Sequence, residues 1–212
     1  MGKTESAVIV VFLLIAFPFS LFIIGWWASA SLCLLGAAPI PEYAIAFSAF
    51  AGLAIGIAIA VLRLKHWVPR FYDLRKALAV LVYLFWSAVA TALFMGLPIG
   101  VLALGALAGF YIGRRGRHAE MEDGPFKKEA RQAALFLAAV VGLVSLAMGT
   151  LAIQEQRSMQ HLLALIGLGR LAESASGRTA LVTVAVPMLV AMQYLLARAA
   201  ASWGFKLGGK KA

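Results

Sequence analysis

Most of the side chains with the chemistry to bind a ligand lie in the last third of the sequence. Arginines, a carboxylate and a histidine occur in the polar segment 154–179, and an amide and a phenol follow on the next apolar run. Two arginines against one or two acids favour a ligand that carries a carboxylate or another anionic group. A few polar groups between mostly apolar walls are also typical of a small-molecule site. The candidate ligand-binding residues are Glu155, Arg157, His161, Arg170, Gln193 and Tyr194. The alternative is that each of them meets water and lipid headgroups independently.

Residue types that support catalysis or metal binding are sparse in the rest of the chain. His66, His118 and His161 lack the i+4 partner and the Cys or Glu company that metal sites use. His66 and His118 lie at the same ends of their apolar runs and have the placement to bracket a haem, although ordinary interfacial histidines are far commoner. The sequence contains no G-x-S-x-G, Walker A, H-E-x-x-H or C-x-x-C motif. We therefore expect no catalytic residue, no metal and no cofactor, and an enzyme is the less favoured class.

The composition of the chain indicates whether water or lipid surrounds the helices that position the candidate residues. Of the 212 residues, 63% are hydrophobic and 13% are charged, and the mean hydropathy is +0.91. Soluble domains are about 45–50% apolar and about 25% charged. Because no water-soluble core can hide this much apolar surface, lipid must surround most of the chain. The sequence predicts one all-α membrane-embedded domain over residues 1–212, a polytopic bundle of transmembrane helices.

Six apolar runs are near the length of about 20 residues that crosses about 30 Å of hydrocarbon. The predicted spans are residues 7–27, 43–62, 77–95, 97–113, 133–153 and 180–201. Between the last two, residues 154–178 have an apolar centre that is too short to span. This segment is expected to be an external interfacial or re-entrant cap, or a helix that lies on the outer leaflet.

The basic residues are distributed unevenly between the two sides of these runs. Sixteen of the 19 lysines and arginines fall at the N-terminus, at the C-terminus, or in the loops that follow the second and fourth runs. The positive-inside rule then places both termini in the cytoplasm, which indicates a multi-pass protein of the plasma membrane. The net charge of +10 is explained by these loops and by anionic lipid, so we do not expect a nucleic-acid partner.

Charged residues are absent from the middle of every predicted span, which argues against a self-sufficient proton pump. The neutral polar residues considered within the spans are Ser20, Ser87, Thr91, Ser145, Thr150, Thr183, Gln193 and Tyr194. Gln193 is the costliest of these to leave facing lipid, so it should face the bundle. There it would either bond to a neighbouring helix or contact a ligand.

Small residues recur every four positions on two of the predicted spans. Helices in a bilayer associate through close backbone approach, which small residues permit. The predicted packing residues are Ser48, Gly52 and Gly56 on the second span and Gly105, Gly109 and Gly113 on the fourth. Beside packing within the chain, such faces also let helices slide or dock a partner subunit.

Two functions are compatible with these features. The first is a small-molecule transport component, in which kinked helices surround a cavity that the last external loop covers. In size, in its six spans and in its cytoplasmic termini, the chain resembles the membrane-embedded substrate-binding subunits of energy-coupling-factor importers. The alternative is a non-catalytic accessory or anchor subunit that packs through its glycine faces. The expected partners are the lipid bilayer and other membrane subunits or a second copy of the chain.

Overall fold

The computed structural model describes four stretches of the chain, residues 2–36, 41–94, 96–154 and 174–207. The regular structure within these stretches is entirely helical, which confirms the predicted all-α class. Close contacts divide the chain into two compact units, residues 1–73 and residues 74–212. Each unit is described by itself below.

The first unit is a pair of long helices followed by a short turn. Helix α1 (Lys3–Leu34) and helix α2 (Glu42–Trp67) pack along most of their lengths, and the 3-10 turn η1 (Phe71–Asp73) follows. Gly36 stands just beyond α1 with φ +66°, a left-handed conformation that commonly ends a helix and that glycine adopts without strain. The hydroxyl of Tyr72 donates a 2.7 Å hydrogen bond to Glu5 Oε1, which ties the turn to the start of α1.

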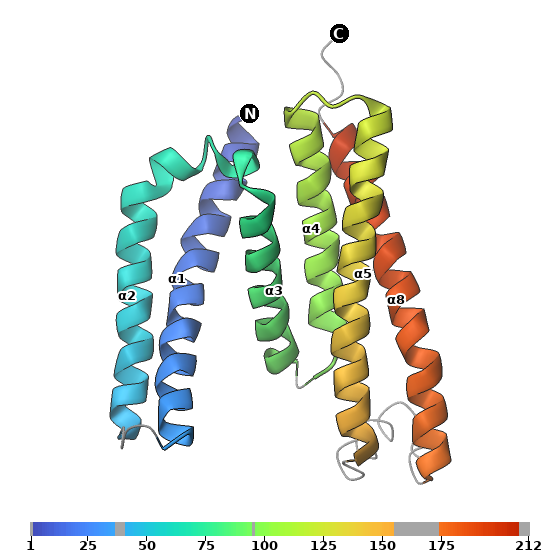
Figure 1. The fold of residues 1–212 in the computed structure, drawn as a ribbon. Helices are drawn as coiled ribbons and strands as arrows, with labels where there is room; N and C mark the ends of the chain where they lie inside the picture. The colour runs from blue at the N-terminus through green and yellow to red at the C-terminus, as the bar shows by residue number, and fades with distance from the viewer. Residues whose placement is uncertain (1, 37–40, 95, 155–173, 208–212) are drawn as a thin grey trace. The chain divides into compact units, whose positions relative to one another are not determined.

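The described part of the second unit consists of four helices (Figure 1). They are α3 (Lys76–Leu93), α4 (Ile99–His118), α5 (Asp123–Gln154) and α8 (Ala175–Lys206). A tight turn joins α3 to α4, and Gly96 within it has φ +85°. Ser174 caps the start of α8 by accepting a 3.0 Å hydrogen bond from the Gly177 amide, which satisfies one of the free N–H groups of the first turn.

Helices α4, α5 and α8 run alongside one another in Figure 1 and make most of the contacts of the second unit. At the end where α4 and α8 finish, Phe126 of α5 stacks on Phe205 of α8 with 3.9 Å between ring centroids. Helix α3 packs mainly against α4, and it also reaches α5 through the Tyr83 side chain and through a 3.0 Å ion pair between Lys76 and Glu129. The core of this unit therefore lies among α4, α5 and α8.

Large apolar side chains point away from both units. Ile15 of α1, Phe47 of α2, Leu107 of α4, Leu143 of α5 and Leu195 of α8 are each more than half exposed. Within the described residues, α1, α2, α3, α5 and α8 are long and apolar enough to cross a membrane by length and composition. Water-soluble monomers rarely expose so much apolar surface, and the helices are compatible with an integral membrane protein.

The helices extend further than the predicted spans at their polar ends. Helix α5 begins at Asp123 instead of residue 133, and α4 continues past residue 113 to His118. Helix α8 begins at Ala175, so residues 175–178 of the predicted external segment belong to a helix, and residues 155–173 lie outside the described part of the chain. The reason is that hydropathy marks the part of a helix that matches hydrocarbon, whereas charged residues continue the same helix beyond it.

Candidate functional site

The side chain of Gln193 lies in the interior of the second unit. It stands on α8 and is 0% exposed, which makes it the most deeply buried polar residue that the structure describes. Neither Nε2 nor Oε1 has a hydrogen-bond partner among the described residues. A carboxamide offers two N–H donors and one carbonyl acceptor. None of this capacity is used within the described part of the chain.

Gly105 of α4 makes the space that the Gln193 amide occupies. A Cβ atom built on Gly105 would overlap Nε2 and would come within 2.9 Å of Oε1. One turn earlier on the two helices lie the apolar residues Val101 and Leu189, and one turn later lie Gly109 and the buried Ala197. The amide therefore packs directly on the backbone of α4, between two apolar layers.

The glycine face of α4 continues this contact beyond Gln193. A Cβ on Gly109 would lie 3.0 Å from the Cα atom of Ala197, and a Cβ on Gly113 would lie 2.8 Å from the backbone nitrogen of Phe205. Helices α4 and α8 run parallel, so each four-residue step along α4 meets the corresponding four-residue step along α8. The α4 glycines thus contact a neighbour inside the same unit.

The corresponding face of α2 packs against α1 in the first unit. Ser48 Oγ and Ser29 Oγ are 2.7 Å apart, and Ser48 Oγ also donates to the Gly25 carbonyl oxygen at 2.9 Å. A Cβ on Gly56 would lie 2.5 Å from the Cα atom of Pro18, and a Cβ on Gly52 would overlap the Leu21 carbonyl. Serine hydroxyls and glycine backbones together hold this pair of helices.

Buried hydroxyl groups on α3 form a second polar feature of the second unit. Tyr83, Ser87 and Thr91 recur every four residues on one face of α3 and are all at least nine-tenths buried. Thr91 Oγ1 donates to the Ser87 carbonyl at 2.8 Å. The hydroxyls of Tyr83 and Ser87 approach each other, but neither makes a hydrogen bond of normal geometry. On α5, the buried Ser145 hydroxyl likewise has no partner among the described residues.

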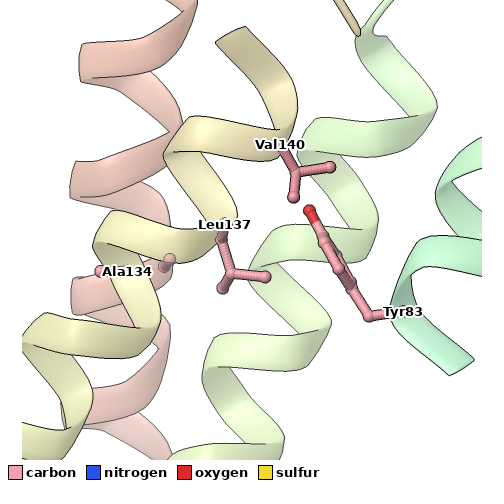
Figure 2. Close-up of a cluster of buried hydrophobic side chains, with 5 residues drawn as sticks. Tyr83, Ala134, Leu137 and Val140 are labelled. Carbon is pink, nitrogen blue, oxygen red and sulfur yellow. The ribbon is translucent and has the colours of Figure 1, made fainter. Parts of the chain in front are cut away.

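Figure 2 shows how Tyr83 reaches from α3 toward α5. Its ring packs in a cluster with Ala134, Leu137 and Val140, and the hydroxyl oxygen lies next to Val140. Ala197 of α8, one turn after Gln193, belongs to the same cluster. The Tyr83 phenol and the Gln193 amide thus border one apolar core. The sequence reasoning missed Tyr83 and gave no role to Ser87, Thr91 or Ser145, although the four-residue spacing on α3 was visible.

Tyr194 has a different environment from its neighbour Gln193. Its ring is partly buried against the Tyr83 cluster, and its hydroxyl accepts a 3.3 Å hydrogen bond from Arg198 Nη1. The Arg198 guanidinium carbon also lies 5.8 Å from the centre of the Tyr194 ring. The polar end of Tyr194 is therefore occupied by Arg198.

The remaining predicted ligand-binding residues are outside the part of the chain that the structure describes. They are Glu155, Arg157, His161 and Arg170. The anionic-ligand site predicted from them stays a prediction.

The two histidines considered for a haem belong to different units, His66 to α2 and His118 to the end of α4. Among the described residues, no group of three or more His, Cys, Asp or Glu side chains is placed to hold a metal ion. Cys33 is exposed near the end of α1.

No family model, no curated protein and no solved structure matches the chain. The functional argument therefore depends on the residues and the contacts described above.

Proposed function

We propose that the chain is an integral membrane protein that acts as a small-molecule transport component, with Gln193 in the path of the solute. The observation that carries this proposal is the fully buried carboxamide of Gln193, whose donor and acceptor atoms have no hydrogen-bond partner in the described structure. Gln193 directly follows the uninterrupted apolar run 184–192 of α8 and lies within the predicted span 180–201.

An unpaired amide in an apolar interior is costly. Moving such a group out of water without a compensating hydrogen bond costs roughly 2–7 kcal/mol, depending on the reference state. The hydrocarbon region of a bilayer holds no water to restore the lost bonds. Polar residues kept at such positions commonly belong to substrate or ion pathways. A solute that pairs with the amide explains why glutamine occupies a position where leucine would fit the apolar layers.

The packing of the glycine faces favours transport over the accessory-subunit alternative. That alternative depended on free glycine faces that dock a partner. Gly105 and Gly109 are covered by α8, and Gly52 and Gly56 are covered by α1. A partner that used these faces would have to displace a helix of the same unit, so the support for docking through glycines is weak.

The wider proposal follows the charge distribution of the sequence. We place both termini in the cytoplasm and the protein in the plasma membrane, because sixteen of the 19 basic residues fall on that side. Glu155, Arg157, His161 and Arg170 would then form an outer mouth that collects solutes before they reach Gln193. Other membrane subunits or a second copy of the chain are the proposed protein partners.

The experiment is solute movement across vesicles that contain the purified full chain. Light scattering after rapid mixing follows the volume recovery of the vesicles in glycerol, urea or sodium lactate. We expect wild-type vesicles to recover faster than empty vesicles for at least one of these solutes. Gln193→Leu should return the rate to that of empty vesicles, and Arg170→Ala should slow the recovery.

Thr183→Val is the matched control. Thr183 is also a polar residue of α8, but it is exposed, and its hydroxyl bonds only to the Thr179 carbonyl of its own helix at 2.8 Å. This variant should keep the wild-type rate. If wild-type vesicles are no faster than empty ones for all three solutes, or if Gln193→Leu and Arg170→Ala both keep full activity, the transport proposal is wrong and the accessory-subunit function replaces it.

A further inference from the structure

One of the buried polar residues that the structure describes in the second unit is charged, namely Arg178 in the first turn of α8. The others are uncharged, and they are Tyr83, Ser87, Thr91, Ser145 and Gln193. The charged residues of its helices lie near the helix ends, as with Lys76 on α3, Arg178 on α8 and the arginines that finish α4. Arg178 lies about four helical turns before Gln193 on the same helix. A charged group brought to Gln193 would therefore have no opposite charge beside it among the described buried residues, and charge without a partner is strongly disfavoured at membrane depth.

The geometry of the Gln193 side chain further limits the class of solute that can bind to it. A primary carboxamide presents an N–H donor and a carbonyl acceptor side by side in one plane. An amide group on a solute can bond to the donor and the acceptor of Gln193 at the same time, because the solute carbonyl accepts from Nε2 while the solute N–H donates to Oε1. A carboxylate only accepts, and a hydroxyl has a single hydrogen to donate.

We infer that the group recognised at Gln193 is an uncharged carboxamide or urea group, which pairs with the Gln193 amide through two reciprocal hydrogen bonds. This inference rests on the transport function proposed above and specifies the class of solute. In the structure the amide packs against Gly105, so binding turns the Gln193 side chain away from α4. Val101 and Leu189 lie one turn before the amide and Ala197 lies one turn after it, so the surroundings of a small solute at this position would be apolar.

The test observes the Gln193 amide itself in the full-length protein. The chain is labelled with ¹⁵N at its glutamine side chains, and the NH₂ resonances are recorded in detergent micelles. The resonances of Gln193 are identified by their loss in Gln193→Leu and, independently, in the longer isostere Gln193→Met. Gln132, which is exposed on α5, is the control within the same molecule.

Acetamide and sodium acetate are the probes, because they have nearly the same shape and differ in charge and in donor capacity. We expect acetamide to shift the Gln193 NH₂ resonances in a concentration-dependent, saturable way and to leave Gln132 unchanged. Sodium acetate and glycerol at the same concentrations should leave Gln193 unchanged.

Three results would overturn the inference. They are a Gln193 shift caused by acetate, a Gln193 shift caused by glycerol that equals the shift caused by acetamide, and the absence of a saturable Gln193 response to acetamide.

These outcomes are distinguishable from a failure of the proposed transport function. If Gln193→Leu abolishes movement of lactate in vesicles and acetate shifts Gln193, transport stands and the uncharged solute class is wrong. If acetamide shifts Gln193 but no vesicle assay detects movement, the binding site stands and the transport function is wrong.

Discussion

Replacing Gly109 by leucine should separate α4 from α8. A Cβ atom at Gly109 would lie 3.0 Å from the Cα atom and 3.1 Å from the carbonyl carbon of Ala197, and closer still to its carbonyl oxygen. All three atoms belong to the backbone, so no side-chain rotation relieves the overlap. Leucine then adds three further heavy atoms at a point where two helix backbones touch.

The magnitude follows from the cost of overpacking. Extra methylene groups in a well-packed core typically cost about 1–3 kcal/mol, and occasionally more where the backbone must move. Gly109→Ala should fall in that range, and Gly109→Leu should reach its upper end or exceed it. Because about 1.4 kcal/mol changes an equilibrium constant tenfold, the leucine variant should shift the unfolding equilibrium roughly a hundredfold.

The assay is reversible unfolding in mixed micelles with increasing sodium dodecyl sulfate. Tryptophan fluorescence is a suitable signal, since Trp203 of α8 lies 5.4 Å from Phe110 of α4 between ring centroids and so reports on this contact. Gly124→Ala is the control, because a Cβ at Gly124 would meet nothing within 4 Å. Alanine there should be neutral or stabilising by up to about 1 kcal/mol. Unfolding of Gly109→Leu at the wild-type detergent concentration would refute the packing of α4 on α8.

Two further predictions concern the topology and the first unit. A membrane-impermeant thiol reagent applied to intact cells should label the native Cys33, because α1 begins on the predicted cytoplasmic side. A cysteine at Gly124 in a Cys33→Ala background should stay unlabelled until the cells are opened, and ready labelling there would reverse or abolish the topology. Ser48→Ala should lower the free energy of unfolding by about 0.6 kcal/mol, the mean for hydrogen bonds between membrane helices. Its effect should be non-additive with Ser29→Ala in a double-mutant cycle, whereas independent effects would show that the 2.7 Å contact contributes nothing.

Composition and apolar run length were enough to predict the helical class. Runs of about 20 apolar residues leave few other structures in lipid, because backbone groups there must bond within their own segment. The same signal gives the membrane-crossing part of a helix and not its ends. Helix α5 begins at Asp123, among charged residues that hydropathy counts against a span. Helix formation there depends on backbone bonds and solvent contact, which apolarity does not measure.

The candidate site was only partly predictable. Gln193 could be selected from the sequence because an amide is costly in lipid, and the structure places it at 0% exposure. Its packing against Gly105 could not be predicted, since spacing within α4 reveals a small-residue face but not the helix that covers it. Tyr83 was missed for another reason. Its ring counts as apolar in a span, and only its four-residue spacing from Ser87 and Thr91 indicates a polar face.

The free energy of unfolding of Gln193→Met, measured without solute, tests the central claim most directly. Methionine matches glutamine in length and removes both unpaired polar atoms. If the amide is kept for a solute, the variant should be more stable than wild type by about 1–3 kcal/mol, the penalty of an unsatisfied buried group, and vesicles that contain it should lose solute movement. Thr183→Val should change neither quantity. A Gln193→Met protein that is less stable than wild type would contradict the account, because the amide would then be a structural bond between helices.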